Sequence, residues 1–525
     1  MGYAFLDDGR VSTVSLDGIQ VAAVAYDAVA QVSGVTYGPV GSPVIGLESL
    51  VRTAAGAAKA QAWSVGARVL SEVVVRSQAG RVTRVQATDS GAAANAVDWS
   101  YSFDAVGRLT SAVLAAVGTR PVVTLGYGYA SAGGCGADPA AGKNGSRTST
   151  TRQVGGGTVA VSAYCTDGAS RLTGVTSGTG GLSVDPATIV YDGHGNATQV
   201  GSQSWWYDGA DRVTGTSTGG TPSQTVSYVR DVLGRVASRS ASGVEASTVR
   251  YGFTGTDDSP DLLLTAGGAV VERYVSLPGG VLHRKGYAVG ATGSWSVSNL
   301  HGDVIATVSG GAVTAGCVYD PFGQPLNPAS GVVDTTAVPA TRAGTGTTDG
   351  WAGVFQRGYE HTGGLNQTLM GARTYLPALG MFTATDPVAG GNTTTYTYPQ
   401  DPMNCQDFSG LRLWDGATET TVGLRGAPRA KVRPRIRAEG PRDINPTEDD
   451  KCRRNIRNCA IFPVTSFEAK SFADANRVYS GLNDDQYQAV RHIMWQAILT
   501  QRLGVDEARQ WGEAHEGLGR SIDSA

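Results

Sequence analysis

The sequence predicts a mainly β protein, an antiparallel sheet built from repeated hairpins, with a small all-α domain at its C-terminal end. The composition supports this, because the 525 residues include 73 glycines and only 17% charged side chains, more glycine than a helical enzyme carries. A short Tyr–Asp unit also recurs through most of the first 320 residues. Clear helical patterns, in contrast, begin only after residue 465.

The overall charge and hydropathy exclude few functions and identify none. The formal net charge of −3 gives no global bias toward nucleic acid or membrane, so such a partner has to be argued from a local segment. No signal peptide opens the chain, and no apolar run reaches the ~20 residues that a membrane span needs. Because Met1 is followed at once by the interior of a repeat, we expect a C-terminal portion of a longer protein, whose targeting device lies in the missing N-terminal region.

The six cysteines are scattered through the chain. In a protein of this size, such spacing favours free or buried thiols over a disulfide framework. Cys452 and Cys459 form the one plausible pair.

The repeated unit consists of a Tyr, two or three residues, an Asp, then Gly, Arg or Asn, and an alternating apolar strand. Each unit predicts a short hairpin, because Asp and Gly provide turn chemistry with a positive backbone angle and the flanks alternate apolar and polar residues. One hairpin cannot bury its apolar face alone, so we expect the units to stack into a long curling sheet. The units are Tyr3 to Arg10, Tyr101 to Arg108, Tyr164 to Arg171, Tyr191 to Asn196, Tyr207 to Arg212, Tyr228 to Arg235 and Tyr319 to Gly323.

Two stretches fit the repeat less well. Residues 41–68 are Ala-rich and lack a Tyr–Asp pair, and residues 130–146 read as an inserted loop. We expect both to decorate the sheet. The Tyr and Asp residues of the repeats are interpreted as structural, as stacked aromatics and turn caps.

The segment from Gly371 to Leu411 separates a Gly-, Val-, Ser- and Thr-rich region from a charged and then helical region. It contains a long motif, GARTYLPALGMFTATDPVAGGNTTTYTYPQDPMNCQDFSGL. It resembles the core-associated segment of the Rhs/YD-repeat polymorphic toxin family, which reads roughly GARYYDPALGRF, a DP pair, N-x-Y-x-Y and DPxGL. Here the second DP pair is Asp407-Phe408, so the fixed backbone angle of a proline is absent. The matching residues are Gly371, Ala372, Arg373, Tyr375, Pro377, Ala378, Leu379, Gly380, Phe382, Asp386, Pro387, Asn392, Tyr396, Tyr398, Asp407, Gly410 and Leu411.

The resemblance covers roughly residues 1–411 and implies a fold and an activity. In that family the sheet spirals into a hollow shell, and two aspartates, here Asp386 and Asp407, form an aspartyl-protease-like site that requires no cofactor. The site cuts the chain after the terminal Leu, which corresponds to the bond between Leu411 and Arg412. The predicted domains are a repeat shell (1–326), a core segment with the autoproteolytic site (327–411), a cleaved basic linker (412–447) and a helical toxin domain (448–525).

Two carboxylates suit peptide hydrolysis. Within about 3 Å of each other they cannot both ionise, so one acts as a base toward water and the other as an acid toward the carbonyl. Asp386 and Asp407 are 21 residues apart, and an antiparallel excursion through the Tyr-rich stretch would bring them together. The other interpretation is that both only cap turns. His301 and Asp303, in a family-typical turn of the last repeat, are given no chemical role.

Beyond Leu411, residues 423–443 carry seven Arg or Lys against two acidic residues, with three prolines. This composition predicts a flexible basic tether, which could also attract anionic lipid or nucleic acid. Helical patterns with Ser or Asn caps follow at 466–479, 484–502 and 505–516, and predict a small all-α domain.

These helices carry a second group of candidate residues. Arg491, His492 and Trp495 lie about one turn apart, and His515 and Glu516 end the next helix. The pattern is similar to a small helical domain at the C-termini of bacterial polymorphic toxins, although the acidic residue that precedes Arg-His there is absent. Two His and a carboxylate on facing helices suit a hydrolytic metal site or acid/base catalysis, with a divalent metal as the candidate cofactor. Otherwise these histidines pack or cap the helices, and Trp495 is expected in the core.

The sequence therefore predicts a bacterial toxin, secreted or delivered at the cell surface, whose shell encloses and then severs a helical effector that acts in a competing or host cell. Its expected partners are a cognate immunity protein and the secretion machinery, and its target is nucleic acid or membrane lipid. The alternative from another class is a non-enzymatic YD-repeat adhesion or wall protein with a C-terminal binding domain.

Overall fold

The computed structural model describes residues 1–411 apart from short gaps (131–133, 220–222, 244–245, 256, 289, 292, 340, 342–346 and 361–363), together with the backbone of Trp414–Asp415. The chain divides into two compact units, Met1–Ala430 and Lys431–Ala525, and all of these residues belong to the first. The helices predicted after residue 465 lie outside the described residues.

Within the described chain, fourteen strands form a first sheet in which every strand pairs with its neighbours in sequence. They are β1 Gly2–Phe5, β2 Val11–Leu16, β3 Ile19–Tyr26, β4 Val32–Tyr37, β5 Ile45–Arg52, β6 Ala58–Val65, β7 Arg68–Arg76, β8 Val82–Asp89, β9 Val97–Phe103, β10 Leu109–Leu114, β11 Val123–Gly128, β12 Ser149–Val154, β13 Ala160–Thr166 and β14 Leu172–Ser177.

A second sheet of thirteen described strands follows in the same sequential order. Its strands are β15 Ile189–Tyr191, β16 Ala197–Val200, β17 Gln203–Tyr207, β18 Val213–Ser217, β19 Gln224–Arg230, β20 Val236–Gly243, β21 Ser247–Gly252, β22 Leu262–Leu264, β23 Val270–Leu277, β24 Val281–Gly286, β25 Ser294–Ser298, β26 Val304–Ser309 and β27 Ala312–Gly316.

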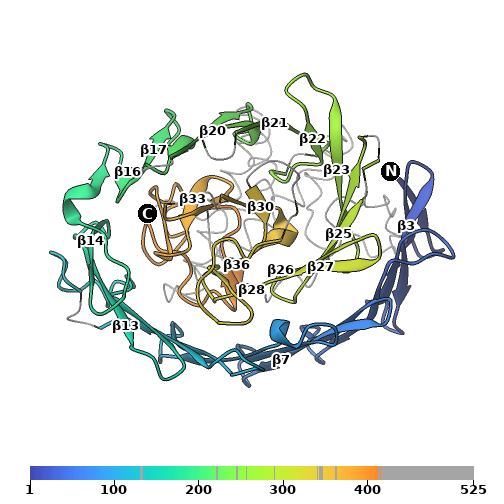
Figure 1. Ribbon diagram of the computed structural model, residues 1–525, viewed down its shortest axis with the longest axis horizontal. Coiled ribbons are helices and arrows are strands. Elements are labelled where there is room, and N and C mark those ends of the chain that lie inside the picture. Colours follow the sequence, from blue (N-terminus) through green and yellow to red (C-terminus); the bar gives the residue numbers. More distant parts are fainter. Residues whose placement is uncertain are drawn as a thin grey trace, which may run out of the picture. The chain divides into compact units, whose positions relative to one another are not determined.

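The remaining elements are short. The two sheets follow one another along a curved wall, and the segment that contains β28 to β33 lies inside the curve (Figure 1). These pairings are antiparallel throughout, so the predicted mainly β fold of curling hairpins is confirmed. The short elements are η1 Ala93–Asn95, η2 Pro186–Thr188, β28 Val318–Tyr319, β29 Pro325–Leu326, β30 Thr347–Asp349, η3 Gly353–Phe355, β31 Gly358–Glu360, β32 Gln367–Met370, β33 Arg373–Leu376, β34 Met381–Phe382, β35 Cys405–Gln406 and β36 Trp414–Asp415.

The turn between β9 and β10 shows why the Tyr–Asp unit forms a hairpin. The Oδ1 atom of Asp104 accepts hydrogen bonds from the backbone N–H groups of Val106 (3.1 Å) and Arg108 (2.9 Å), and Oδ2 accepts from the Arg108 guanidinium at 2.7 Å. Gly107 has a φ of 92°, which glycine adopts without steric cost. The same two backbone bonds recur at Asp167, Asp192, Asp208, Asp231 and Asp320.

Residues 41–68 contradict the expectation that they decorate the sheet, because they form β5 and β6 within it. Thr53 takes the place of the aspartate in the turn between these strands. Its Oγ1 atom accepts the Ala57 N–H at 3.2 Å, and Gly56 has a φ of 85°. The Tyr–Asp pattern misses this hairpin because a hydroxyl replaces the carboxylate.

A disulfide joins Cys135 to Cys165, so the expectation of free thiols is wrong for this pair. It ties the loop at 130–146 to β13, and no strand interrupts the described part of that loop. Cys317 is a buried thiol. Cys452 and Cys459 lie outside the described residues.

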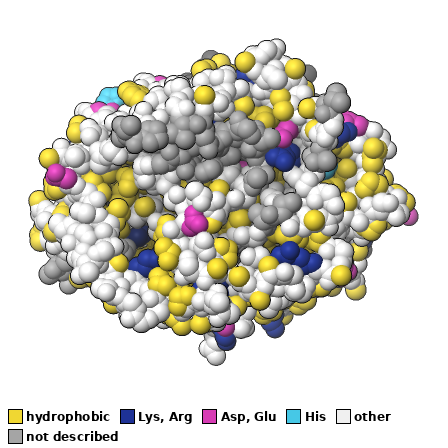
Figure 2. Space-filling model, viewed as in Figure 1, with side chains coloured by type: hydrophobic (Ala, Val, Ile, Leu, Met, Phe, Trp, Pro, Cys, Tyr) yellow, Lys and Arg dark blue, Asp and Glu magenta, His cyan; other side chains and the backbone are white. Residues whose placement is uncertain are grey.

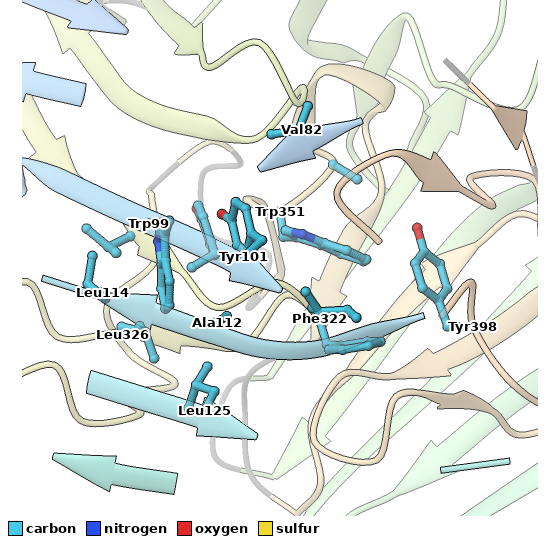
Figure 3. Packing of buried hydrophobic residues seen from close by; sticks show 14 of the residues in the cluster. Val82, Trp99, Tyr101, Ala112, Leu114, Leu125, Phe322, Leu326, Trp351 and Tyr398 are labelled. Carbon is cyan, nitrogen blue, oxygen red and sulfur yellow. The ribbon is translucent and has the colours of Figure 1, made fainter. Parts of the chain in front are cut away.

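We call the two large sheets (β1–β27) the wall and residues 318–411, from β28 onward, the inner segment. The two parts share one apolar cluster. The aromatic rings and aliphatic side chains of both parts interdigitate, as Figure 3 shows. Each large apolar side chain that leaves water contributes about 1.5–3 kcal/mol, so this cluster holds the inner segment to β9–β11. Its members include Trp99, Tyr101, Leu114 and Leu125 of the wall and Phe322, Leu326, Trp351 and Tyr398 of the inner segment.

A buried ion pair fixes the inner segment at a second place. Arg239 on β20 donates to both carboxylate oxygens of Glu360 on β31, at 2.8 and 2.7 Å. Glu360 also accepts a hydrogen bond from the hydroxyl of Tyr228 on β19 at 2.9 Å. Removing one partner of such a pair costs about 3–5 kcal/mol, so the pair holds β31 firmly against the wall.

Charged side chains are sparse on one face of the molecule (Figure 2). On the face seen in Figure 2, charged side chains form small separate groups among hydrophobic and polar atoms. In the part of the chain that the structure describes, no helix has the length and apolar character of a membrane span.

Candidate active site

Asp386 lies in the loop after β34. Its backbone N–H donates to the Thr395 carbonyl at 2.9 Å, which closes the loop through the Tyr-rich stretch. Its Oδ1 atom accepts the Val388 N–H at 2.9 Å. The side chain is only 4% exposed, so this loop presents the carboxylate to the protein interior.

Asp407 follows β35 directly and is completely buried. Its backbone N–H donates to the Tyr398 hydroxyl at 3.2 Å. Its Oδ1 atom accepts hydrogen bonds from the Leu411 N–H at 3.1 Å and the Ser409 hydroxyl at 3.3 Å. The chain therefore folds back over Asp407 and brings Leu411 to it.

Arg373 on β33 joins the two aspartates. Its Nη2 atom lies 2.9 Å from Oδ2 of Asp386 and 2.9 Å from Oδ2 of Asp407. Its Nε donates to the Gly410 carbonyl at 2.6 Å, and its Nη1 donates to the Thr395 carbonyl at 3.2 Å. The sequence prediction that the two aspartates meet thus agrees with this geometry, and a shared cation lies next to both.

Burial lowers the pKa of Arg373 from its ordinary value, and the two carboxylates offset part of this shift. The guanidinium also lies 3.7 Å from the ring centroid of Phe382, on whose face a cation is attracted. Even a lowered arginine pKa leaves the side chain charged at neutral pH. The cation next to the two aspartates is therefore permanent.

Asn392 supplies a second shared donor. Its Nδ2 atom lies 3.0 Å from Oδ2 of Asp386 and 2.8 Å from Oδ2 of Asp407. The amide therefore restrains the same pair of oxygen atoms as Arg373, from a different element of the chain.

The predicted scissile bond begins beside this cluster. A Cβ atom on Gly391 would lie 2.3 Å from the Leu411 carbonyl oxygen and 2.9 and 3.1 Å from the two Asp386 carboxylate oxygens. These three oxygens therefore surround one small space, which glycine leaves open. Leu411 is 37% exposed and borders a cavity of about 570 Å³.

Arg412 lies outside the described residues. Just beyond it, the backbone of β36 pairs with β35, with Gln406 opposite Trp414 and Cys405 opposite Asp415. The chain on both sides of the Leu411–Arg412 bond is thus tied to the strand that leads into Asp407.

Phe408, which stands where the family motif has proline, is packed into the core. It is 7% exposed, and its ring stacks on Phe355 with centroids 3.7 Å apart. This contact restrains the backbone after Asp407 in place of a proline ring.

The second group of predicted residues, Arg491, His492, His515 and Glu516, lies outside the described residues, as does Trp495. Among the described side chains there is no cluster of three or more His, Cys, Asp or Glu suited to a metal ion.

Sequence reasoning assigned no role to Arg373, Asn392 and Gly391, although the first two belong to the quoted motif. The signal for Arg373 and Asn392 was their presence in a motif with two carboxylates, because a buried acidic pair needs donors. Nothing in the sequence indicates the close approach of Leu411 to Gly391.

No protein-family model and no curated protein sequence matches the chain. Similar solved structures contain TcdB2 and TccC3. One, the crystal structure of TcdB2-TccC3-Cdc42, aligns with 78% of this chain at 16% identity and a TM-score of 0.51. Another, a Photorhabdus luminescens Tc holotoxin pore with a mutated TccC3, aligns with 81% at 16% identity and a TM-score of 0.47.

The chain spans about a fifth of the length of the solved chains it matches, 21% for the TcdB2-TccC3-Cdc42 structure. At this identity the likeness concerns the fold alone. It agrees with the curling repeat sheet that the Tyr–Asp units predict and with the Rhs-type fold that the resemblance implies. The described part of the chain therefore shares its fold with part of the TcdB2-TccC3-Cdc42 structure.

Proposed function

We propose that this chain is a toxin-associated repeat shell that cuts itself between Leu411 and Arg412 and so releases the residues beyond. The observation that carries the proposal is the convergence of Asp386 and Asp407 on shared donors, next to the Leu411 carbonyl. Paired carboxylates beside a peptide carbonyl are the groups that water-mediated peptide hydrolysis requires.

In the proposed reaction, a water molecule adds to the Leu411 carbonyl carbon. Asp407 takes a proton from this water. Asp386, in its protonated form, donates its proton to the Leu411 carbonyl oxygen, which lies beside it. The proton that Asp407 took then passes to the Arg412 nitrogen, the C–N bond breaks, and the former carbonyl oxygen returns its proton to Asp386. The products are a Leu411 carboxylic acid, which ionises at neutral pH, and an Arg412 amine. Arg373 contacts both side chains and so holds Asp386 and Asp407 within reach of one bond.

Two observations support secretion and a role in a toxin. The fold is shared with a TcdB2-TccC3-Cdc42 structure, and the Cys135–Cys165 disulfide suits an oxidising compartment. A partner that carries the shell to its target and an immunity protein against the released residues complete the proposal.

The cut is tested on purified protein by denaturing gel electrophoresis and intact mass. Wild type should give two fragments that meet between Leu411 and Arg412, while Asp386→Asn and Asp407→Asn should stay whole. Asp334→Asn alters an aspartate whose side chain accepts hydrogen bonds from Thr336 and Asn327 in a turn, and it should be cut like wild type. If both site variants are cut normally, the aspartyl mechanism is wrong.

The harmful activity is proposed to belong to residues 412–525 and to depend on Arg491, His492, His515 and Glu516. Alanine at any of the last three should abolish growth arrest when these residues are expressed in a cell. Circular dichroism shows whether each variant is folded. Folded variants that still arrest growth would assign the activity to binding or membrane disruption instead.

A further inference from the structure

His301 has acceptors on both ring nitrogens. Its Nδ1 atom lies 3.0 Å from each carboxylate oxygen of Asp303, and its Nε2 atom lies 2.8 Å from the Pro402 carbonyl oxygen. The two side chains of this pair are each 8% exposed. Asp303 is held in turn by the backbone N–H of Ala352 at 2.9 Å and the amide of Asn299 at 2.9 Å.

A neutral imidazole carries one N–H and one lone pair, so it can donate to only one of these acceptors. The other nitrogen would then point its lone pair at an oxygen that cannot donate. Because a peptide carbonyl never donates and the Asp303 carboxylate already accepts two further N–H bonds, protons on both nitrogens match this set of acceptors best. The doubly protonated ring, the imidazolium, is thus the form that can donate to all of these acceptors at once.

This ring is connected to the candidate active site. The His301 carbonyl accepts the side-chain amide of Gln406 at 3.0 Å, and Gln406 directly precedes Asp407. Together with the bond to Pro402, the turn at 299–303 therefore holds both ends of the segment 402–406. The wall also contacts this segment at Asn404, whose side-chain oxygen accepts the Val82 N–H at 2.7 Å.

The surroundings of the ring are acidic. Glu72 on β7 accepts the Leu300 N–H at 2.7 Å and the Gln61 amide at 2.9 Å. It borders, with His301 and Asp303, a cavity of about 120 Å³, which has room for several water molecules. Arg76, Asp89 and Asp320 line the same cavity, and the Trp351 ring lies 6.2 Å from His301.

We propose that His301 is a positioning residue for Asp407, and that it holds the segment 402–406 in the cutting geometry only while its ring is doubly protonated. The inference rests on the proposed self-cleavage. It predicts that cutting slows as the pH rises, in a way that depends on one histidine outside the site.

The direction of the pH dependence follows from the titrating groups. Burial alone would lower the pKa of His301, but Asp303 and the Pro402 carbonyl outweigh it and raise the pKa above its ordinary value. This contribution to stability is complete below the unfolded pKa of about 6.5 and is lost as the pH rises through the folded value. Burial also raises the pKa of Glu72 to about 7, so its contribution declines in the same direction.

Nitrogen-15 NMR of histidine-labelled protein tests the charge state, since the chain has six histidines. His301 should carry protons on both ring nitrogens at pH 7, and the Asp303→Asn variant should lose one of them. His194, whose ring is 66% exposed beside Asp211, serves as the internal reference for a solvent-accessible His–Asp pair. A neutral His301 at pH 7 overturns the inference.

The cutting rate tests the positioning role. Chains synthesised in a cell-free system are transferred to buffers from pH 6 to 9, and the fragments are followed over time. Wild type should cut at least ten-fold more slowly at pH 9 than at pH 6, and His301→Gln should cut slowly at every pH with a flat profile. His194→Gln should follow wild type.

The outcomes separate the two proposals. A wild type that is never cut refutes the proposed function and the positioning role with it. A wild type that is cut at one rate from pH 6 to 9 refutes only the role of His301. If His301→Gln melts below the assay temperature, Asp303→Asn gives the same comparison, because it keeps the shape of the pair and removes its charge.

Discussion

Single residues decide the chemistry of the candidate site, and Arg373 is the most connected of them. Its guanidinium binds two carboxylates and two carbonyl oxygens, one of them that of Gly410, next to the predicted cut. Only a planar group with several donors in fixed directions can satisfy all four acceptors. A point charge of the same sign cannot.

Arg373→Lys should therefore lose most of the cutting while retaining part of the stability. A misplacement of about 1 Å lowers a catalysed rate by about 10²-fold, so we expect a loss of that size in a time course of fragment formation. Arg373→Met, which leaves two buried carboxylates without a cation, should cost about 3–5 kcal/mol and lower the melting temperature much further.

The matched control is Arg84→Lys, because Arg84 pairs with Asp98 on the surface and is 45% exposed. It should leave cutting and melting unchanged. Cutting of Arg373→Lys at the wild-type rate would show that the shared donor is dispensable.

Gly391→Ala should slow the cut without weakening the wall. The new methyl group would stand 2.3 Å from the Leu411 carbonyl oxygen, closer than any van der Waals contact, and so would displace that carbonyl from Asp386. Gly209→Ala is the control, since a Cβ there meets nothing within 4 Å and neither glycine has a positive φ. Equal cutting of both variants would place the Leu411 carbonyl elsewhere during the reaction.

At the scale of elements, the wall depends on one type of turn used many times. An acceptor side chain at the first position binds two backbone N–H groups, and a residue near the end takes a positive φ. Glycine is the usual choice there, but Ser170 (φ 61°) and Asp211 (φ 60°) take the same conformation. The turn is thus defined by its hydrogen bonds more than by its glycine.

Asp231→Ala should open the β19–β20 hairpin, because the N–H groups of Leu233 and Arg235 lose their acceptor at 2.9 and 3.0 Å. Each lost bond is worth about 1 kcal/mol. Asp231→Asn keeps that acceptor and loses only a partly exposed ion pair with Arg235, so it should stay within about 1 kcal/mol of wild type. Hydrogen exchange of the β19 and β20 amides measures both. Equal protection in the two variants would contradict this account of the turn.

The sequence was informative where structure follows from local chemistry. Tyr–Asp–Gly units predicted hairpins because the turn is closed by residues a few positions apart. A hydroxyl in the place of the carboxylate, at Thr53, Ser77 and Thr265, concealed further hairpins of the same kind. The motif likewise predicted the meeting of Asp386 and Asp407. It could not predict which side chain would lie next to both, because Arg373 reaches them through a fold of the backbone and not through spacing.

The hydrogen bond between His301 and Pro402 joins residues about a hundred positions apart. No local sequence pattern predicts it. The Cys135–Cys165 disulfide was missed for a similar reason, since the inserted loop decides the distance between the two thiols. The spacing of residues in the sequence therefore does not predict how the inserted loop and the inner segment contact the wall.

For the whole molecule, the important relation is between the wall and what it surrounds. In each of the two large sheets that form the wall, only the first and last described strands have an unpaired side, so the wall offers a protease few openings. If the wall also encloses the residues beyond Leu411, as we propose, it protects their basic tether.

Mild trypsin digestion should therefore leave residues 425–437 intact in the native protein, although this Arg-rich stretch is an easy target in an unfolded chain. The same digestion after unfolding in urea is the control and should remove the stretch at once. Rapid loss from native protein would place the released residues outside the shell.

The strictly sequential pairing of the wall strands also sets an order of events during synthesis. The hydrogen-bonding partner of each strand within a sheet directly precedes it in the sequence, so a hairpin can form as soon as its second strand has been synthesised. The aromatic cluster needs residues of β9–β11 and of the inner segment, and Asp407 is among the last described residues to emerge. We therefore expect the proposed cut to follow the formation of the wall, because Asp407 is synthesised after all of the wall strands.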